Sequence, residues 1–381
     1  MSDPDRSEWR HTTLGAVIRL QRGHDLPTSA RIPGDVPVVG SGDSDGCHNE
    51  AIARGPGVVI GRATNLGRPK YIRVPYWPLN TTLYVKDFLG NDERYIYYLF
   101  RTLNLTGFDS GSVQPMLNRN NVENVPVLLP PITEQHAIAE VLGALDDKIQ
   151  ANRRQISTIA RLIAATWQQS FGATTGSGWP RMPIGELVRV VGGATPSTSV
   201  SGFWGGSISW ATPKDLSRLS SVPIMSTERR ITEQGLKQIS SGLLPVGTVL
   251  LSSRAPIGYI AITELPLAIN QGFMALIVDE RLSNLYLWQW LVAHLDEVKG
   301  LANGTTFLEV SKANFRPMLI GVPPEGLMRS WTECAESEYR LIVARERESQ
   351  TLTTLRDKIL PRLLSGEVRV RDAEALVGEP V

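Results

Sequence analysis

The sequence predicts an α+β fold in which two mixed α/β domains are joined and separated by two long antiparallel helices, a pseudo-two-fold duplication. At 381 residues the chain is too long for one ordinary domain core. Segments of the first half recur in the second, and a long helical pattern follows each copy. We expect domains at 1–131 and 173–324, helices at 132–172 and 325–368, and a tail at 369–381.

The duplication is visible as matching residues in the same order. Gly111, Asn121, Pro130 and Pro131 align without gaps on Gly304, Asn314, Pro323 and Pro324. Further anchors lie upstream in both copies: Leu20–Gly23 with Val190–Gly193, Gly57–Ile60 with Gly247–Leu250, Arg62–Gly67 with Arg254–Gly258, and Leu79–Thr82 with Ile269–Gly272. One supersecondary unit is therefore used twice.

Each copy contains short β-branched segments that Gly and Pro interrupt, such as 56–61 and 245–251, which indicates strands and loops. Apolar spacing predicts one helix at about Asp92–Leu103 and another at Leu285–Lys299.

A long helix is expected over Thr133–Phe171, with Thr133 as its N-cap. Its seam has alternating steps of four and three, typical of a coiled coil. The expected packing residues are Ile138, Leu142, Leu145, Ile149, Asn152, Ile156, Ile159 and Ile163.

The second copy has the same steps with a polar middle, and Gly366 is expected to end its helix. The expected seam is Leu327, Trp331, Cys334, Glu338, Leu341, Arg345, Glu348, Leu352, Leu355 and Ile359. In an antiparallel pair, Asn152 and Arg345 fall near one level. A buried polar pair there would fix the register; alternatively, both residues lie at a solvated edge.

Composition narrows the class of protein. No apolar run approaches the roughly 18–20 residues of a membrane span, and the polar start of the chain is unlike a secretory signal, so we expect a cytoplasmic protein. Cys47 and Cys334 are expected to be free thiols, and no metal site is expected from the histidine spacing. The net charge of +1 is not typical of a nucleic-acid-binding protein. Residues 1–131, however, contain twelve Arg and only two Lys, and Arg suits contacts to phosphate and guanine.

Catalytic motifs are absent from the sequence. Residues 40–46 are Gly-rich but lack the spacing and the lysine of a phosphate loop, which leaves a turn or a recognition loop. Glu297-Val298-Lys299 matches only the end of a nuclease motif, and Asp146-Asp147 and Asp279-Glu280 fit solvated faces better than acid/base pairs. We therefore expect a chain without catalysis of its own.

Several longer motifs together resemble the specificity subunit of type I restriction-modification enzymes, over about residues 12–370. In the first half they are Trp77–Asp87, Asn91, Tyr97–Leu99, Gly111-Ser112, Pro115 to Arg119 and Pro130 to Gln135. In the second half they are Gly193 to Ser197, Trp210–Leu216, Ser252–Gly258, Asn270–Phe273 and Leu355–Glu367.

The resemblance implies two target recognition domains, each reading one half of a bipartite, asymmetric site in double-stranded DNA, with the helices setting the gap. It implies two methyltransferase subunits that use S-adenosylmethionine, at adenine, and two motor-nuclease subunits that use ATP and Mg. This chain would bind none of these cofactors. Two alternatives are a related methyltransferase-nuclease or other phage-defence complex, and a protein scaffold or lone nuclease.

Asn, Gln and Arg make the bidentate bonds that distinguish bases in the major groove, so polar loop residues are the candidate DNA contacts. In the first half these are Arg62, Asn80, Thr81, Ser112, Gln114, Asn118 and Arg119. In the second half they are Thr195, Ser197, Trp204, Lys214, Ser253, Arg254, Asn270, Gln271, Thr305 and Lys312.

Some candidates have a plain structural interpretation. Asn80 and Asn270 recur in both copies and would cap turns, since shared residues do not discriminate different sequences. Arg62 and Arg254 fit phosphate better than bases. The discriminating residues are expected where the copies differ, at Ser41–Asn49 and Ser197–Gly206, where Trp204 would pack or act as a wedge.

Overall fold

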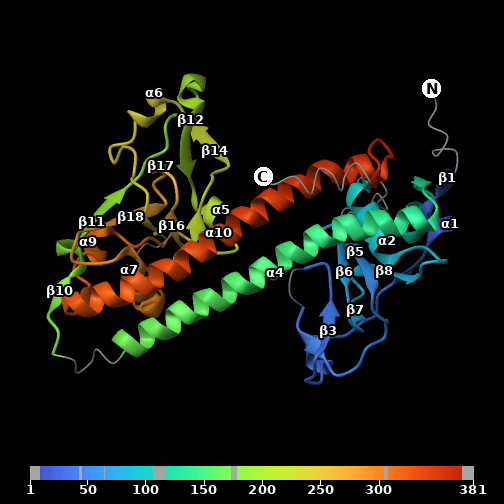
Figure 1. Cartoon of the computed structure of the whole chain (residues 1–381), viewed down its shortest axis with the longest axis horizontal. Helices are drawn as coiled ribbons and strands as arrows, with labels where there is room; N and C mark the ends of the chain where they lie inside the picture. The colour runs from blue at the N-terminus through green and yellow to red at the C-terminus, as the bar shows by residue number, and fades with distance from the viewer. Residues whose placement is uncertain are drawn as a thin grey trace. The chain divides into compact units, whose positions relative to one another are not determined.

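The computed structural model describes residues 9–42, 45–63, 65–105, 116–172, 178–303 and 308–370. These form two compact units (Figure 1). The first unit contains the residues up to Ile149 together with those from Thr351 onward, and the second contains Gln150–Gln350. The two 40-residue helices, α4 (Ile132–Phe171) and α10 (Glu325–Leu364), each contribute to both units. The expected fold class, two mixed α/β domains with two long helices, is confirmed.

The first unit has three small sheets. The largest has the order β2-β8-β5-β6 and is antiparallel throughout, a second has the order β4-β3-β7, and β1 pairs with β9. The strands are β1 (Arg10–Thr13), β2 (Arg19–Arg22), β3 (Val36–Val39), β4 (Cys47–His48), β5 (Gly57–Gly61), β6 (Pro69–Ile72), β7 (Trp77–Pro78), β8 (Thr82–Asp87) and β9 (Pro126–Leu129). The shorter helices are α1 (Leu14–Val17), the 3-10 turn at Thr28–Ala30, α2 (Glu93–Thr102) and α3 (Arg119–Glu123).

Helix α2 covers the large sheet beside β5 and β6 (Figure 1). The Asp92 carboxylate accepts a hydrogen bond from the Tyr95 amide at 2.6 Å and so caps the helix. Its inner face buries Tyr95, Ile96, Tyr98, Leu99 and Phe100. The helix predicted at Asp92–Leu103 is therefore confirmed, with both end residues acting as caps.

The second unit repeats this architecture. Its sheets have the orders β11-β18-β15-β16-β13, β14-β12-β17 and β10-β19. The strands are β10 (Arg181–Pro183), β11 (Val188–Gly192), β12 (Trp204–Ala211), β13 (Pro223–Ile224), β14 (Arg229–Ile231), β15 (Val249–Ser252), β16 (Ile260–Thr263), β17 (Leu267–Ile269), β18 (Phe273–Val278) and β19 (Leu319–Gly321). The helices are the 3-10 turns at Ile184–Glu186 and Ser201–Phe203, α5 (Pro213–Leu216), α6 (Glu233–Leu236), α7 (Asn284–Ala293), α8 (Leu295–Gly300) and α9 (Lys312–Phe315). The large sheet of the second unit matches that of the first strand for strand and has one extra strand, β13. The duplication is therefore confirmed.

The single helix predicted at Leu285–Lys299 is wrong, because it is two helices that meet at His294. The His294 ring stacks on Trp290 with 4.5 Å between ring centroids. Its Nδ1 lies 2.9 Å from the Trp290 carbonyl oxygen. A side chain that competes for a helical carbonyl in this way favours a helix end.

The two long helices pack antiparallel within each unit. In the first unit, Ile138, Leu142 and Leu145 of α4 share a core with Ile359, Leu360 and Leu363 of α10. In the second unit, Ile156 and Ile163 share a core with Met328 and Trp331, whose indole donates to Thr166 at 3.3 Å. Ile149 and Asn152 are buried, whereas Ile159 is partly buried.

Two details of the helix prediction are wrong. Helix α4 begins at Ile132, and the Pro131 carbonyl accepts from Gln135, so Thr133 lies inside the first turn rather than at the N-cap. In α10, Leu327 and Leu341 are 37% and 51% exposed, and Cys334 is exposed. Trp331 is buried as predicted, but the other buried positions of this half of α10 lie one residue further along the helix than expected. The reason is that this half also packs on its domain, where the Tyr339 hydroxyl donates to Glu264. The shifted positions are Met328, Ala335, Tyr339 and Ile342.

The C-terminal end of α10 is as predicted. Gly366 has a φ of +70°, and the amides of Glu367 and Val368 both donate to the Arg362 carbonyl. None of the helices in the described ranges combines the length and hydropathy that a bilayer span requires.

Candidate nucleic-acid interface

Two loops of the first unit are held against each other where β2 ends and β8 begins. A Cβ on Gly23 would lie 2.1 Å from the Leu79 carbonyl oxygen, so only glycine fits there. The His24 amide donates to the Pro78 carbonyl at 2.8 Å, and the Asn80 amide donates to the His24 carbonyl at 3.0 Å. The backbone of both loops is therefore fixed relative to the sheet.

This scaffold presents a polar pair at the surface. The Asn80 side-chain amide donates to the Asp25 carboxylate, and this hydrogen bond is exposed to solvent. The bond that Asn80 makes here joins it to another side chain, so it differs from the turn-capping bond expected for this residue.

The described start of the glycine-rich loop, residues 40–42, is anchored beside the same place. The Ser41 amide donates to Thr81 Oγ1 at 3.4 Å, and Asn65 donates to the Ser41 carbonyl at 2.7 Å. The Lys70 ammonium donates to the Gly40 carbonyl at 2.8 Å. Thr81 therefore supports this loop rather than projecting into solvent.

Three arginines surround a hollow of about 320 Å³ next to these loops. It is lined by Arg22, Arg62 and Arg119, with Met116 and Asn118 among the other residues. Within the described ranges, the one ion pair that these arginines form joins Arg119 to Glu123 at 3.9 Å. Partial burial, and next the like charge of Arg22, lower the pKa of Arg62. Such a hollow suits an anion, because an anion would relieve this repulsion.

The second unit builds the same pair of loops. A Cβ on Gly193 would lie 2.0 Å from the Ile269 carbonyl oxygen, and the Ala194 amide donates to that oxygen at 3.1 Å. Here the exposed pair is Thr195 and Gln271, whose hydroxyl and side-chain carbonyl are 2.6 Å apart.

The strand ladders correct the alignment of the two copies. β5 pairs with β8 so that Gly61 faces Thr82, and β15 pairs with β18 so that Ser252 faces Phe273. Arg62 is therefore equivalent to Ser253, and Asn80 is equivalent to Gln271. The sequence pairing of Arg62 with Arg254 and of Asn80 with Asn270 is wrong by one residue.

Asn270 and Ser253 have structural roles. The Asn270 carbonyl Oδ1 accepts from the Gly272 amide at 2.9 Å and closes a turn. Ser253 is only 2% exposed, and its amide donates to the Gly272 carbonyl. Ser253 is thus buried directly after β15, which is unlike a side chain that projects to a ligand.

The positions of the second unit that correspond to the arginine hollow carry less positive charge. Gly192 occupies the place of Arg22, and Lys312 begins α9 as Arg119 begins α3. Arg254 forms an ion pair with Glu309 at 3.1 Å. Lys214 is also paired, with Glu228 at 3.1 Å.

Trp204 packs on its own domain. Arg229 lies 3.6 Å over its ring, and Trp210 meets it edge to face at 5.1 Å. The indole donates to the Ser197 carbonyl at 3.1 Å. Of the two roles expected for Trp204, this geometry fits packing. Asn118 caps α3 through the Asn120 amide, and Ser112, Gln114 and Thr305 lie outside the described residues.

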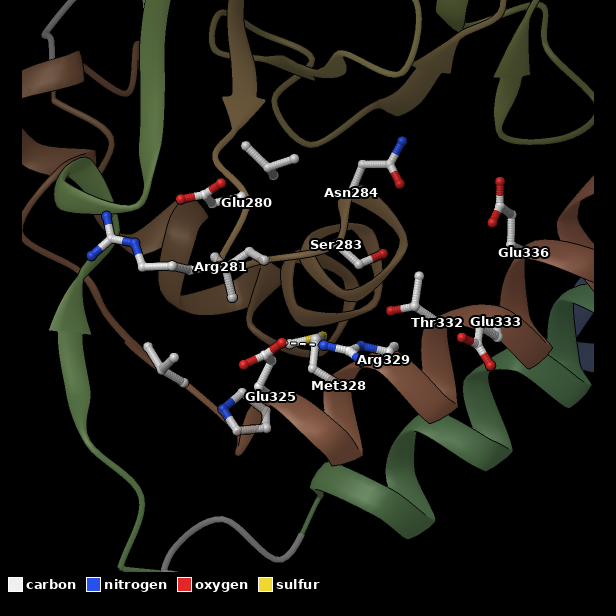
Figure 2. A pocket seen from close by; sticks show the side chains of 14 residues that line it. Glu280, Arg281, Ser283, Asn284, Glu325, Met328, Arg329, Thr332, Glu333 and Glu336 are labelled. Carbon is white, nitrogen blue, oxygen red and sulfur yellow. Dashed lines mark hydrogen bonds and ion pairs between the residues drawn. The ribbon is translucent and has the colours of Figure 1, made fainter.

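A larger groove of about 910 Å³ lies elsewhere in the second unit, between the start of α7 and the first turns of α10 (Figure 2). Figure 2 shows Glu333 and Glu336 on α10 across from Ser283 and Asn284, with Glu325 paired to Arg329. The Thr332 hydroxyl is buried with no hydrogen-bond partner among the described residues. The excess of carboxylates makes this groove unsuitable for DNA phosphates.

Comparisons with known proteins agree with this architecture. The family model described as "Type I restriction modification DNA specificity domain" matches residues 6–161 and again 176–326. The M. genitalium type I restriction-modification S subunit, known from a crystal structure, has the same fold. Its TM-score is 0.64 at 15% identity, over 93% of this chain and 96% of that one.

Curated relatives match over shorter regions. The MjaIX specificity subunit of Methanocaldococcus jannaschii is 36% identical over 168 residues, which is 42% of this chain and 39% of the relative. The HindI specificity subunit of Haemophilus influenzae is 26% identical over 194 residues, which is 50% of this chain and 42% of the relative. The chain thus spans about two fifths of the length of these two relatives. Because the family model matches both units and most of the chain, the protein belongs to the family of type I restriction-modification DNA specificity proteins.

Proposed function

We propose that this chain is the sequence-specific DNA-binding subunit of a type I restriction-modification complex. Each unit reads one half of a bipartite, asymmetric target, and the two long helices set the number of unread base pairs between the halves. The observation that carries the proposal is the arginine hollow beside an exposed amide. Arg22, Arg62 and Arg119 bind the phosphate backbone, and side chains next to them reach base edges.

The chain itself does no chemistry in this proposal. Two methyltransferase subunits modify adenine with S-adenosylmethionine, and two motor-nuclease subunits use ATP and Mg. Both act in the cytoplasm, where the target DNA lies. The acidic groove along α10 suits a basic protein surface, so we assign it to a partner subunit rather than to DNA.

The first experiment is to co-express the chain with the methyltransferase encoded beside it and to map modified bases by single-molecule sequencing. One bipartite motif with a fixed gap is the expected result. Random modification by a stable, active complex contradicts the proposal and favours a scaffold role.

The role of the hollow is tested with the purified complex. Arg22→Ala and Arg62→Ala should weaken binding to target and non-target duplexes alike, and each should reduce the slope of log K against log[salt] by about 1. Arg54→Ala, an exposed arginine of the same unit outside the hollow, is the matched control. An unchanged salt slope in both hollow variants would show that these arginines do not contact phosphate.

A further inference from the structure

The two exposed side-chain pairs occupy equivalent positions in the two units. β2 and β8 pair Arg22 with Leu83, and β11 and β18 pair Gly192 with Met274. Counting three residues onward from Arg22 and from Gly192 leads to Asp25 and Thr195. Asn80 and Gln271 are equivalent by the β5–β8 and β15–β18 ladders. Asp25 with Asn80 therefore stands where Thr195 with Gln271 stands in the other copy.

Both pairs are held on rigid backbone. The glycine before each pair lies too close to a carbonyl oxygen for any side chain, at 2.1 Å for Gly23 and 2.0 Å for Gly193. Each pair is also joined internally by a side-chain hydrogen bond. Side chains fixed in this way lose little conformational entropy when they meet a ligand.

The pairs differ in the hydrogen-bonding groups that are left without a partner among the described residues. Asn80 donates one N–H to Asp25, which leaves the second carboxylate oxygen of Asp25 and the side-chain carbonyl of Asn80 as acceptors, and the second N–H of Asn80 as the one donor. Thr195 donates its hydroxyl proton to the side-chain carbonyl of Gln271, which leaves both N–H groups of the Gln271 amide as donors and the Thr195 hydroxyl oxygen as an acceptor. The first pair is rich in acceptors, and the second is rich in donors.

We propose that these two pairs are equivalent base-reading elements, and that their different chemistry makes the two half-sites differ at this position. This inference rests on the proposed DNA-binding function. The acceptors of Asp25 and Asn80 match a base with an exocyclic amino group in the major groove, adenine or cytosine. The donors of Gln271 match a base that presents acceptors, guanine or thymine.

The test exchanges the pairs. The double variant Asp25→Thr, Asn80→Gln gives the first unit the pair of the second, and Thr195→Asp, Gln271→Asn makes the reverse exchange. Each purified methyltransferase complex is measured against duplexes in which every base pair of both half-sites is replaced in turn. We expect each exchange to change the preferred base pair at one position of its own half-site, by at least about tenfold in relative affinity. Each exchange also serves as the control for the other half-site.

Other outcomes have distinct meanings. An unchanged preference at every position, or an equal loss at all positions, overturns the proposal while leaving the DNA-binding function intact. A wild-type complex that shows no sequence preference overturns the proposed function itself. Thermal unfolding of each variant identifies misfolding. For a misfolded exchange, Asp25→Asn and Gln271→Glu repeat the test with nearly isosteric changes: the first replaces an acceptor by N–H donors and keeps an oxygen for Asn80, and the second replaces N–H donors by an acceptor.

Asn270→Ala separates a structural residue from a reading residue. Asn270 closes a turn under Gln271, so its replacement should weaken all binding by the second unit without changing any base preference. A changed preference in Asn270→Ala, with none in the Gln271 variants, would assign the reading role to Asn270 instead.

Discussion

Asn152 of α4 donates a hydrogen bond to Glu348 of α10, with 3.0 Å between Nδ2 and Oε2. Its Nδ2 also lies 3.3 Å from Ser349 Oγ. Arg345, expected at the same level, is linked to Asn152 through both of these partners: its guanidinium bonds Glu348 at 2.9 Å, and its carbonyl accepts from the Ser349 hydroxyl at 2.8 Å. Asn152 is fully buried, and its Oδ1 has no partner among the described residues.

Asn152→Leu should raise thermal stability, because it removes a buried acceptor without a partner, which costs about 1–3 kcal/mol. Glu348 and Ser349 would keep their bonds to Arg345. The expected rise is a few degrees in the unfolding midpoint, at about 2–4 °C per kcal/mol for a unit of this size. Differential scanning calorimetry measures it.

Asn152→Ala is the control, since it also removes the polar group but leaves a cavity, and its midpoint should fall below that of the Leu variant. A lower midpoint for Asn152→Leu than for the wild type would show that the polar contact is a net source of stability.

Arg356→Met should destabilise the first unit by about 3 kcal/mol, because it leaves Asp146 as a mostly buried charge without its ion-pair partner. The Arg356–Asp146 distance is 2.6 Å, and the side chains are 14% and 18% exposed. Asp146 also accepts from the Tyr98 hydroxyl at 2.7 Å. Urea unfolding gives the free energy.

The double variant Asp146→Asn, Arg356→Met should recover much of that loss, since an amide is neutral and still offers an oxygen to Tyr98. Equal losses in the single and double variants would mean that the guanidinium acts through its packing rather than its charge.

Acid should weaken the contact between α2 and α4. A hydrogen bond from Arg94 holds the pKa of Asp147 below its ordinary value of 3.8, with Arg73 acting in the same direction against the effect of burial. A carboxylate with a depressed folded-state pKa adds stability above its unfolded pKa, and that stability is lost as the pH falls through the folded-state pKa.

The comparison is the unfolding free energy of wild type and Asp147→Asn between about pH 5 and pH 3. The Asn variant should be less stable near pH 5, with the difference shrinking at lower pH. Because the Asp147 side chain is 43% exposed, the effect should stay below about 1 kcal/mol. A constant difference over the whole range would exclude titration of Asp147 as its cause.

Gly193→Ala should abolish recognition by the second unit, because its Cβ would lie 2.0 Å from a backbone oxygen and force the Thr195 loop away from Gln271. A loss of at least tenfold in target affinity is expected. Gly300→Ala, where a Cβ meets nothing within 4 Å, is the matched control and should bind as the wild type does. Normal binding by the Gly193 variant would show that this close approach is not needed.

The sequence was sufficient to predict the elements with strong periodicity and clear end signals. α2 has one continuous apolar face, and Gly366 ends α10 as predicted. The burial of Met328 and Ile342 in place of Leu327 and Leu341 was not predictable, because this half of α10 packs against both a helix and a domain. A coiled-coil pattern with two apolar positions per heptad predicts burial correctly only for a helix that packs against one other helix.

The candidate site was only partly predictable because identical letters are not the same as equivalent positions. Asn80 and Asn270 are the same residue type, yet the strand ladders show that Gln271, not Asn270, is the structural equivalent of Asn80. Arg22 and Asp25 were not among the predicted site residues, although the alignment of the repeat already matched Arg22 with Gly192. That difference in charge at an aligned position was the available signal.

The interleaved composition of the units has a consequence for the order of folding. Leu142 and Leu145 are covered by Ile359 and Leu363, which lie about two hundred residues further along the chain. At a synthesis rate of about 5–20 residues per second, the first unit waits on the order of 10–40 s with this apolar surface open. The second unit is one continuous segment, Gln150–Gln350, so the domain that is made second is the first able to complete its core.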